Sequence, residues 1–422
     1  MLPTRATVWL FVGGLAFYFA AVIVAALAEL FAGWFPGLAQ FPLAAGALWL
    51  VVGFDACILV LFLIDGAYTY WTFRLQARRE RPARLSLGAE NEVVLVLDNA
   101  SNRRLHVLCF DEVTGKKLWE RQFVSTGNTN CHPKSCMAAP TPVTDGKVVF
   151  ALFATGDLAA IERDGSLLWY RSLETDYPGI ANQVGMAASP LLYDGTLIVP
   201  MDNSGDSFLA GLDARTGKNR WKVERVRDIN WMTPVLHVQG GKTSVLFQTE
   251  RAVTAYDPRT GKERWTAPTE KGSTIPSPVV GDDMVFAPGS PLVALKPGAD
   301  GTTPQVVWSS NKLSSGFASP LLYGDRLYAL TRTGVNCVRA KDGELLWQER
   351  IKGPFSASPV VADGKMYIVT EDGFVTVLKL GNKPEVLAVN EMDDVILATP
   401  AIANGCLYLR SDKYLYCIGE KK

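Results

Sequence analysis

The chain has 422 residues, a formal net charge of zero, 48% hydrophobic residues and 20% charged residues. This balance gives no electrostatic reason to expect a nucleic acid or a strongly acidic partner. Only three histidines are present, so general acid–base chemistry has few obvious agents. Seven cysteines cannot all pair within one chain.

The hydrophobic excess is concentrated at the N-terminus. Residues 7–28 carry no charge and are long enough to span a bilayer, and a second apolar stretch, 43–64, is interrupted only by Asp55. A cleaved signal peptide would have a shorter apolar run followed by a small-residue cleavage site. We therefore predict a two-helix transmembrane anchor over residues 1–73 and a basic juxtamembrane linker with a β-segment over 74–104.

Arginines predict how this anchor is oriented. Arg5 precedes the first apolar stretch, five arginines lie from Arg74 to Arg84, and the connecting segment has no basic residue. The positive-inside rule then places both ends in the cytoplasm. We expect a multi-pass protein of the inner (cytoplasmic) membrane with its C-terminal domain in the cytoplasm; a periplasmic domain is the alternative.

Residues 105–422 are organised by a repeat. Its clearest copy, ASPVVADGKMYIVTEDGFVTVL (357–378), predicts three short strands separated by Asp-Gly turns. The Ser/Thr-Pro pair that opens it recurs every 39–48 residues, at Pro142, Pro190, Pro234, Pro278, Pro320, Pro359 and Pro400. A period of this length with several strands per unit is typical of an all-β propeller.

A second phrase lies between the copies. It reads CFDEVTGKKLW at 109–119, GLDARTGKNRW at 211–221, AYDPRTGKERW at 255–265 and CVRAKDGELLW at 337–347. Each predicts a turn followed by an outer strand that carries a tryptophan. We expect a structural role for these rings, wedged between neighbouring blades with the indole N–H on a backbone carbonyl. The six are Trp119, Trp169, Trp221, Trp265, Trp308 and Trp347.

Aspartate, then Thr-Gly-Lys, then Trp resembles the repeat of the PQQ-like (quinoprotein-type, BamB-like) β-propellers over residues 105–420. That superfamily includes quinoprotein dehydrogenases and the propeller of the outer-membrane barrel assembly machinery. The resemblance implies eight, or alternatively seven, four-stranded blades. Eight would require residues 85–98 to supply substitute strands, because 105–123 lacks its own Ser/Thr-Pro opening, and the repeat at Pro400 stops after its third strand.

Residues 1–104 resemble a different group, a bacterial family of unknown function. Its members have a membrane hairpin, a β-sandwich segment and a cytoplasmic von Willebrand A-like domain. The propeller repeats begin here where that sandwich would continue. The chain is therefore interpreted as a fusion.

Long loops before the Ser/Thr-Pro pairs predict a binding surface on one face of the propeller. These loops are residues 124–140, 174–189 and 225–233, and the turns between second and third strands emerge beside them. The candidate partner-binding residues are Asn130, Cys131, His132, Asn182, Gln183, Asp202, Asn230, Trp231, Arg251, Arg332, Phe355 and Arg410.

Two segments were weighed as metal sites. Cys131-His132 with Cys136 could supply metal ligands, but no second Cys/His pair follows at ligand spacing, so a disulfide staple or two separate thiols is the favoured interpretation. The segment MDNSGDS (201–207) lacks the acidic spacing of an EF-hand, and a solvated turn is favoured there.

These features predict a membrane-anchored propeller that binds a protein partner or acts as a scaffold. We expect no enzyme activity, no cofactor and no metal. The alternative is a quinoprotein-like oxidoreductase that uses PQQ or a metal at the loop face. The sequence has no adjacent Cys-Cys pair of the kind found in those dehydrogenases.

Overall fold

The computed structural model describes residues 92–99 through their backbone and residues 104–127, 131–180, 185–281, 283–298 and 303–419 in full. The chain divides into two compact units, residues 1–75 and 76–422. The predicted membrane anchor and the resemblance of residues 1–104 to a family with a membrane hairpin lie largely outside the described residues and stay predictions. None of the helices in the described part is long and apolar enough to cross a bilayer.

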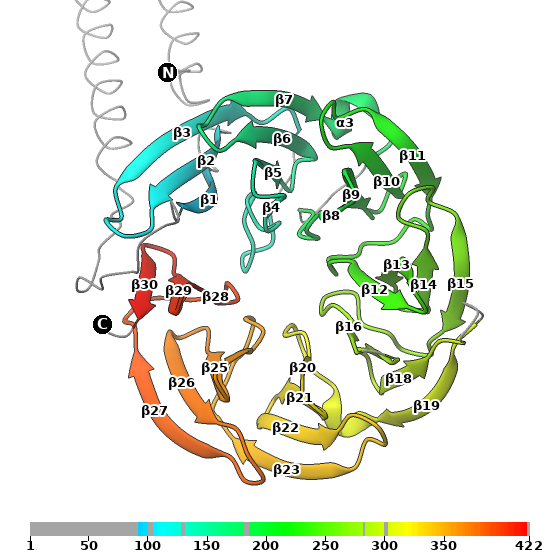
Figure 1. The fold of residues 1–422 in the computed structure, drawn as a ribbon, viewed down its shortest axis with the longest axis vertical. Coiled ribbons are helices and arrows are strands. Elements are labelled where there is room, and N and C mark those ends of the chain that lie inside the picture. The colour runs from blue at the N-terminus through cyan, green and yellow to red at the C-terminus, as the bar shows by residue number, and fades with distance from the viewer. Residues whose placement is uncertain are drawn as a thin grey trace, which may run out of the picture. The chain divides into compact units, whose positions relative to one another are not determined.

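The described residues of the second unit form eight separate antiparallel sheets, which follow one another in chain order around a common axis (Figure 1). Six sheets have four strands each. The first two of these sheets contain β4 (Val143–Thr144), β5 (Val148–Leu152), β6 (Asp157–Glu162) and β7 (Leu167–Ser172), and then β8 (Leu191–Tyr193), β9 (Thr196–Met201), β10 (Phe208–Asp213) and β11 (Asn219–Glu224). The next two contain β12 (Val235–Gln239), β13 (Lys242–Gln248), β14 (Ala252–Tyr256) and β15 (Glu263–Pro268), and then β16 (Val279–Val280), β17 (Val285–Ala287), β18 (Leu292–Lys296) and β19 (Gln305–Ser310). The last two contain β20 (Leu321–Tyr323), β21 (Arg326–Thr331), β22 (Gly334–Arg339) and β23 (Leu345–Arg350), and then β24 (Val360–Ala362), β25 (Lys365–Val369), β26 (Phe374–Lys379) and β27 (Glu385–Glu391).

The other two sheets have three strands and meet where the ring closes. The first contains β1 (Glu92–Asn99), β2 (Arg104–Asp111) and β3 (Lys117–Val124), and the last contains β28 (Ala401–Ala403), β29 (Cys406–Arg410) and β30 (Leu415–Gly419). Two short helices, α3 (Leu173–Asp176) and η2 (Asn311–Leu313), follow β7 and β19. The all-β propeller is therefore confirmed.

The expectation of eight four-stranded blades is wrong. Residues 85–98 were expected to supply substitute strands, but within the described residues this region contributes only β1, which pairs with β2 along its length. The repeat at Pro400 does stop after its third strand, β30, as its sequence predicts.

A buried carboxylate joins the first and last sheets. Glu112 follows β2 and is 8% exposed. It accepts hydrogen bonds from the Tyr408 hydroxyl and, at 3.1 Å, from the Asn404 side-chain amide, both in the last sheet. The two ends of the described ring are thus fastened by polar contacts between residues almost 300 positions apart.

The repeated tryptophans lie between neighbouring sheets, as predicted. In five of the six, the indole N–H donates to a backbone carbonyl in the next sheet, as in the 2.8 Å bond from Trp119 to Arg163. Trp265 is 5% exposed and packs against Val285 and Leu295 of the next sheet.

The Thr-Gly-Lys turn supplies the surface on which the tryptophan rests. Gly261 has φ +71°, and a Cβ built there would lie 2.5 Å from Trp221 of the preceding sheet. Gly165, Gly217 and Gly343 lie in the same way against Trp119, Trp169 and Trp308. Glycine is therefore favoured at this position for two reasons: the backbone is in the left-handed conformation, and a side chain would collide with the neighbouring tryptophan ring. The aspartate that opens the phrase accepts hydrogen bonds from the turn, as Asp213 does from Thr216.

A second set of contacts links the sheets close to the axis. In six of the seven repeats, the backbone N–H of the Ser or Thr before the repeat proline donates to the side-chain hydroxyl of the equivalent residue in the next sheet. We name these six bonds the inner belt. They run, at 2.9–3.0 Å, from Thr141 to Ser189, Ser189 to Thr233, Thr233 to Ser277, Ser277 to Ser319, Ser319 to Ser358 and Ser358 to Thr399.

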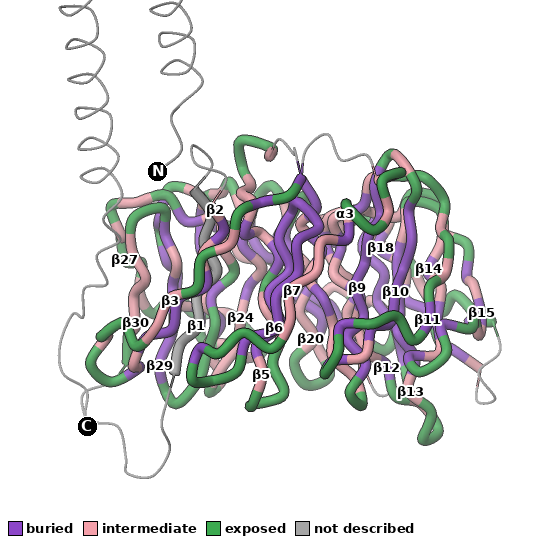
Figure 2. The backbone as a smooth tube through the Cα atoms, turned by 90° about the horizontal axis from the view of Figure 1, so that it is seen from above, coloured by how far each residue is buried: buried purple, intermediate pink, exposed green. Residues whose placement is uncertain are grey.

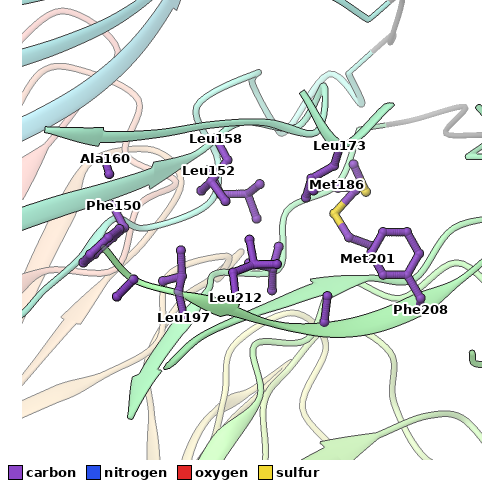
Figure 3. Packing of buried hydrophobic residues seen from close by; sticks show 13 residues of the cluster. Phe150, Leu152, Leu158, Ala160, Leu173, Met186, Leu197, Met201, Phe208 and Leu212 are labelled. Carbon is purple, nitrogen blue, oxygen red and sulfur yellow. The ribbon is translucent and has the colours of Figure 1, made fainter. Parts of the chain in front are cut away.

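Apolar side chains fill the space between adjacent sheets. Phe150, Leu152 and Leu158 face Leu197 and Leu212 across one such interface (Figure 3). Buried inner strands run through the thickness of the ring, and the exposed residues lie in the turns at its two faces and along the outer strands (Figure 2). The turns are consequently available for functions other than holding the core.

The glycine contact gives a matched test. Replacing Gly261 by Ala should lower the free energy of unfolding more than replacing Gly364, which has φ +66° but nothing within 4 Å of its added Cβ. Both variants carry the left-handed backbone penalty of about 1–2 kcal/mol. We expect Gly261→Ala to cost about 1–3 kcal/mol more, because the methyl overpacks against Trp221.

Thermal or denaturant unfolding of both variants measures that difference. Equal destabilisation would show that the tryptophan does not rest on the glycine turn.

Candidate functional site

The segments that enter the inner strands and the turns between second and third strands emerge on one side of the ring, which we call the loop face. A central cavity of about 410 Å³ opens there. The segments before the first strands of seven sheets contribute to it. Its lining residues are His132, Lys134, Ser135, Cys136, Ala139, Ala187, Trp231, Ile275, Phe317, Ser356, Leu397, Ala398, Arg410, Ser411 and Asp412.

A second depression, the side groove, adjoins this cavity. It has a volume of about 910 Å³ and lies between the sheet β20–β23 and the sheet β24–β27. Lys134 and Phe317 line both spaces, so the two form a continuous surface. The remaining lining residues are Gly316, Leu330, Thr331, Arg332, Thr333, Arg350, Ile351, Lys352, Gly353, Pro354, Phe355 and Glu371.

The structure brings five of the predicted candidates to this surface. His132, Trp231 and Arg410 line the central cavity, whereas Arg332 and Phe355 line the side groove. Cys131 lies next to the cavity residue His132, and its thiol contacts the Met137 sulfur at 3.5 Å. Arg251 is exposed on its turn and lines neither space. Asn130, Asn182 and Gln183 lie outside the described residues.

Two further candidates, Asp202 and Asn230, lie inside the propeller instead of on its surface. Asp202 is 5% exposed and forms a bidentate ion pair with Arg225, at 2.8 and 3.1 Å. The Asn230 amide donates to Asp202 and to the Gln248 carbonyl. The sequence favoured a solvated turn for Asp202 and a place on the binding face for both residues, and their polar partners explain their burial.

The Arg225 guanidinium completes this internal network. It donates to the Tyr256 hydroxyl at 2.7 Å and stacks 3.9 Å from the centroid of Phe247. Burial is the largest influence on Tyr256 and raises the pKa of its hydroxyl. The network fixes the loop before β12 against the two sheets beside it, so it supports the loop face from below.

Trp231 also connects neighbouring loops. Its indole N–H donates to the Gly185 carbonyl at 2.9 Å, and its backbone N–H donates to the Thr274 carbonyl at 2.8 Å. The ring is half-buried and still borders the central cavity. The ring therefore forms part of the cavity wall, and its exposed part can contact a ligand in the cavity.

An ion pair between distant segments forms the border of the two spaces. The Lys134 ammonium lies 2.8 Å from the Glu371 carboxylate and 5.4 Å from the centroid of Phe317. Ser356 donates a second hydrogen bond to Glu371 at 2.8 Å. Burial alone would raise the pKa of Glu371, but the bonds from Lys134 and Ser356 outweigh it and lower that pKa. Sequence reasoning missed this pair, whose members lie 237 residues apart.

Metal-ligating side chains do not come together in the described residues. Across the described ranges, no group of three or more His, Cys, Asp or Glu side chains is placed to hold a metal ion. In the 201–207 turn, Asp202 pairs with Arg225, Asp206 pairs with Arg227 at 2.6 Å, and the Asn203 side chain accepts from the Gly205 N–H. The acidic side chains of this turn are thus engaged by arginines.

The Glu371 environment predicts a pH dependence. Because the folded pKa lies below the ordinary value near 4.5, the ion pair stabilises the fold above pH 4.5 and loses its contribution as the pH falls through the folded value. Glu371→Gln should lower the free energy of unfolding at pH 7 by about 0.5–1 kcal/mol, because Lys134 is partly exposed. The difference in unfolding free energy between the two proteins should be present at pH 7 and should shrink as the pH falls below 4.5, and a difference that stays constant with falling pH would contradict the assignment.

Comparison with known proteins places this geometry in a family. The family model for the outer membrane protein assembly factor BamB matches residues 61–184, 103–291 and 289–383. Curated relatives with that name come from Yersinia pestis, with 27% identity over 47% of this chain and 57% of the relative, and from Burkholderia pseudomallei, with 26% identity over 56% and 61%. The chain thus spans little more than half the length of these relatives.

Solved structures with the same fold have lower sequence identity. BamB from Moraxella catarrhalis superposes with a TM-score of 0.56 and 17% identity, over 79% of this chain and 95% of that structure. A europium-containing methanol dehydrogenase gives 0.52 and 11%, over 75% and 80%. These values show a shared propeller fold and nothing about activity. Together with the match of the family model to most of the chain, they show that this protein belongs to the PQQ-like propeller family of the outer membrane protein assembly factor BamB.

Proposed function

We propose that this chain is a membrane-anchored scaffold that binds a protein partner through its loop face. The central cavity is the observation that carries the proposal. Loops that lie far apart in the sequence converge on it, with apolar residues such as Ile275 and Leu397 lining the same cavity as charged residues such as Arg410 and Asp412. An apolar centre with a polar rim is the usual anatomy of a protein–protein interface.

The residues of this surface are suited to a binding role. Phe317 is 44% exposed, although its ring is large and apolar, and it lies on the border of the cavity and the side groove. Half-buried Trp231 provides a second aromatic wall. Aromatic and arginine side chains that surround a recess are the residue types in which binding energy is concentrated. The relatives' printed name, an assembly factor for outer membrane proteins, supports a partner of the same chemical class.

Enzyme activity is the less favoured function. The similarity to a methanol dehydrogenase extends to the fold alone, at 11% identity. The sequence contains no adjacent Cys-Cys pair of the kind that the quinoprotein dehydrogenases place beside their cofactor. We therefore assign no catalytic residue.

Site-specific photocrosslinking tests the partner-binding surface. A photoreactive phenylalanine analogue at position 317 or 132 should crosslink a protein in the native host, because both side chains are exposed on the loop face. The same analogue at Leu118 or Val306, which are exposed on outer strands, is the matched control. Crosslinks at the control positions alone would place the partner elsewhere and contradict the proposal.

The anchor and its orientation complete the proposal. The charge-free stretch 7–28 and the apolar stretch 43–64 are long enough to form a membrane hairpin. The arginines from Arg74 to Arg84 favour a cytoplasmic location for the residues that follow them, and hence for the propeller. With Arg5 on the cytoplasmic side, a periplasmic propeller would require that one of the two stretches does not span the membrane.

Cysteine labelling distinguishes the two compartments. Lys341 is exposed in the turn between β22 and β23, so a Lys341→Cys variant offers an accessible thiol. We expect a membrane-impermeant maleimide to label this position, above the level of the unsubstituted protein, only after the inner membrane is broken. Labelling in cells with only a permeabilised outer membrane would place the propeller in the periplasm and overturn the proposed orientation.

A further inference from the structure

The side groove has a charge imbalance that the whole chain does not share. The protein is formally neutral, with 42 basic and 42 acidic residues. Among the residues that line the groove, four are basic, and Glu371 is the single carboxylate. A neutral protein thus presents a local excess of positive charge in one concave place.

The excess is not compensated by neighbouring side chains. Lys134 is already paired with Glu371 at 2.8 Å. Arg332, Arg350 and Lys352 are exposed, and none of them takes part in an ion pair among the described residues. Three cations therefore line the groove, and their N–H groups can donate hydrogen bonds to solvent or to a ligand.

The groove also offers apolar surface between these charges. Leu330 and Ile351 are buried beneath it, Phe355 is half-buried, and Phe317 is 44% exposed at its border with the central cavity. A ligand that fits must combine negative charges with at least one apolar group. The volume of the side groove, about 910 Å³, lies near the upper end of the range for ligand pockets.

We propose that the side groove binds an extended acidic peptide segment of the partner, with carboxylates on Arg332, Arg350 and Lys352 and an apolar side chain against Phe317 and Phe355. This inference rests on the proposed protein-binding function and names the chemistry of the segment that is recognised. Carboxylates suit guanidinium groups because two parallel hydrogen bonds can form at once.

Other anionic partners fit the groove less well. A single-stranded nucleic acid would require successive aromatic rings on which bases stack along a basic track, and here three cations are confined to one recess. An anionic bilayer presents a broad surface, whereas these cations surround a depression between two sheets. An acidic peptide can place its carboxylates and an apolar side chain in the side groove at the same time.

Fluorescence anisotropy with the full chain in detergent tests the proposal. The probe is a labelled octapeptide, Glu-Asp-Phe-Glu-Asp-Leu-Asp-Glu, and its control replaces every carboxylate by the corresponding amide. We expect the acidic probe to bind at least about tenfold more tightly than the amide control, and its binding to weaken as salt is raised from 50 to 300 mM.

Substitutions locate the binding to the groove. Arg350→Gln and Lys352→Gln should each weaken binding of the acidic probe by about fivefold or more. Arg215→Gln and Lys262→Gln remove the same charge from exposed turns on the opposite face and should leave the affinity unchanged. Circular dichroism and the unfolding midpoint establish that each variant is folded.

Three results would overturn the inference: equal binding of the acidic and amide peptides, equal losses in the groove and control variants, or groove-dependent binding to vesicles with 30% phosphatidylserine in place of the peptide. The proposed function is assessed separately by the crosslink from position 132. A crosslinked partner there without acidic-peptide binding removes only the groove inference, whereas no crosslink at either loop-face position removes the proposed function as well.

Discussion

The propeller depends on one constraint: in six repeats, the N–H of the Ser or Thr before the proline donates to the hydroxyl of its counterpart in the next sheet. Proline follows each of these residues and cannot donate to a strand ladder, so it is tolerated at the start of the innermost strand. The N–H just before it is left without a partner in its own sheet. In the inner belt this donor is used to hold the neighbouring sheet, six times in succession.

The tryptophan contacts perform the same task near the circumference. Trp221, for example, donates to the Pro258 carbonyl and rests on Gly261, both in the next sheet. From the sheet β4–β7 to the sheet β24–β27, adjacent sheets are therefore joined at two radii, with the apolar core between them. The segments of the loop face differ in length, and they carry the central cavity, the side groove and their charges.

Much of the fold could be predicted from sequence because its determinants are local and repeated. The Ser/Thr-Pro pairs mark the inner strands, and the phrase ending in Trp marks the outer ones. The role of the tryptophans followed from their recurrence, and the structure confirms it. The closure of the ring could not be predicted, because β1 joins the first sheet from a region that carries no repeat signature.

Less of the candidate site than of the fold could be predicted from the sequence. His132, Trp231 and Arg332 were identified because they lie in loops or turns on the correct face. The burial of Asp202 and Asn230 could not be predicted, because their partners, Arg225 for Asp202 and the Gln248 carbonyl for Asn230, lie in other segments of the chain. The Lys134–Glu371 pair and the three uncompensated cations of the side groove depend on which sheets become neighbours around the ring, and a pattern within one repeat does not contain that information.

Hydrogen exchange at the inner belt tests the central claim most directly. In the wild-type protein, the Thr233 amide should exchange far more slowly than amides in exposed turns, since it donates to Ser277 at 3.0 Å. Ser277→Ala removes that acceptor and should accelerate exchange at Thr233 by about tenfold or more, whereas Ser166→Ala in an exposed turn should not. Thr233 exchange as fast as that of the exposed turns in the wild type, or unchanged in Ser277→Ala, would contradict the account.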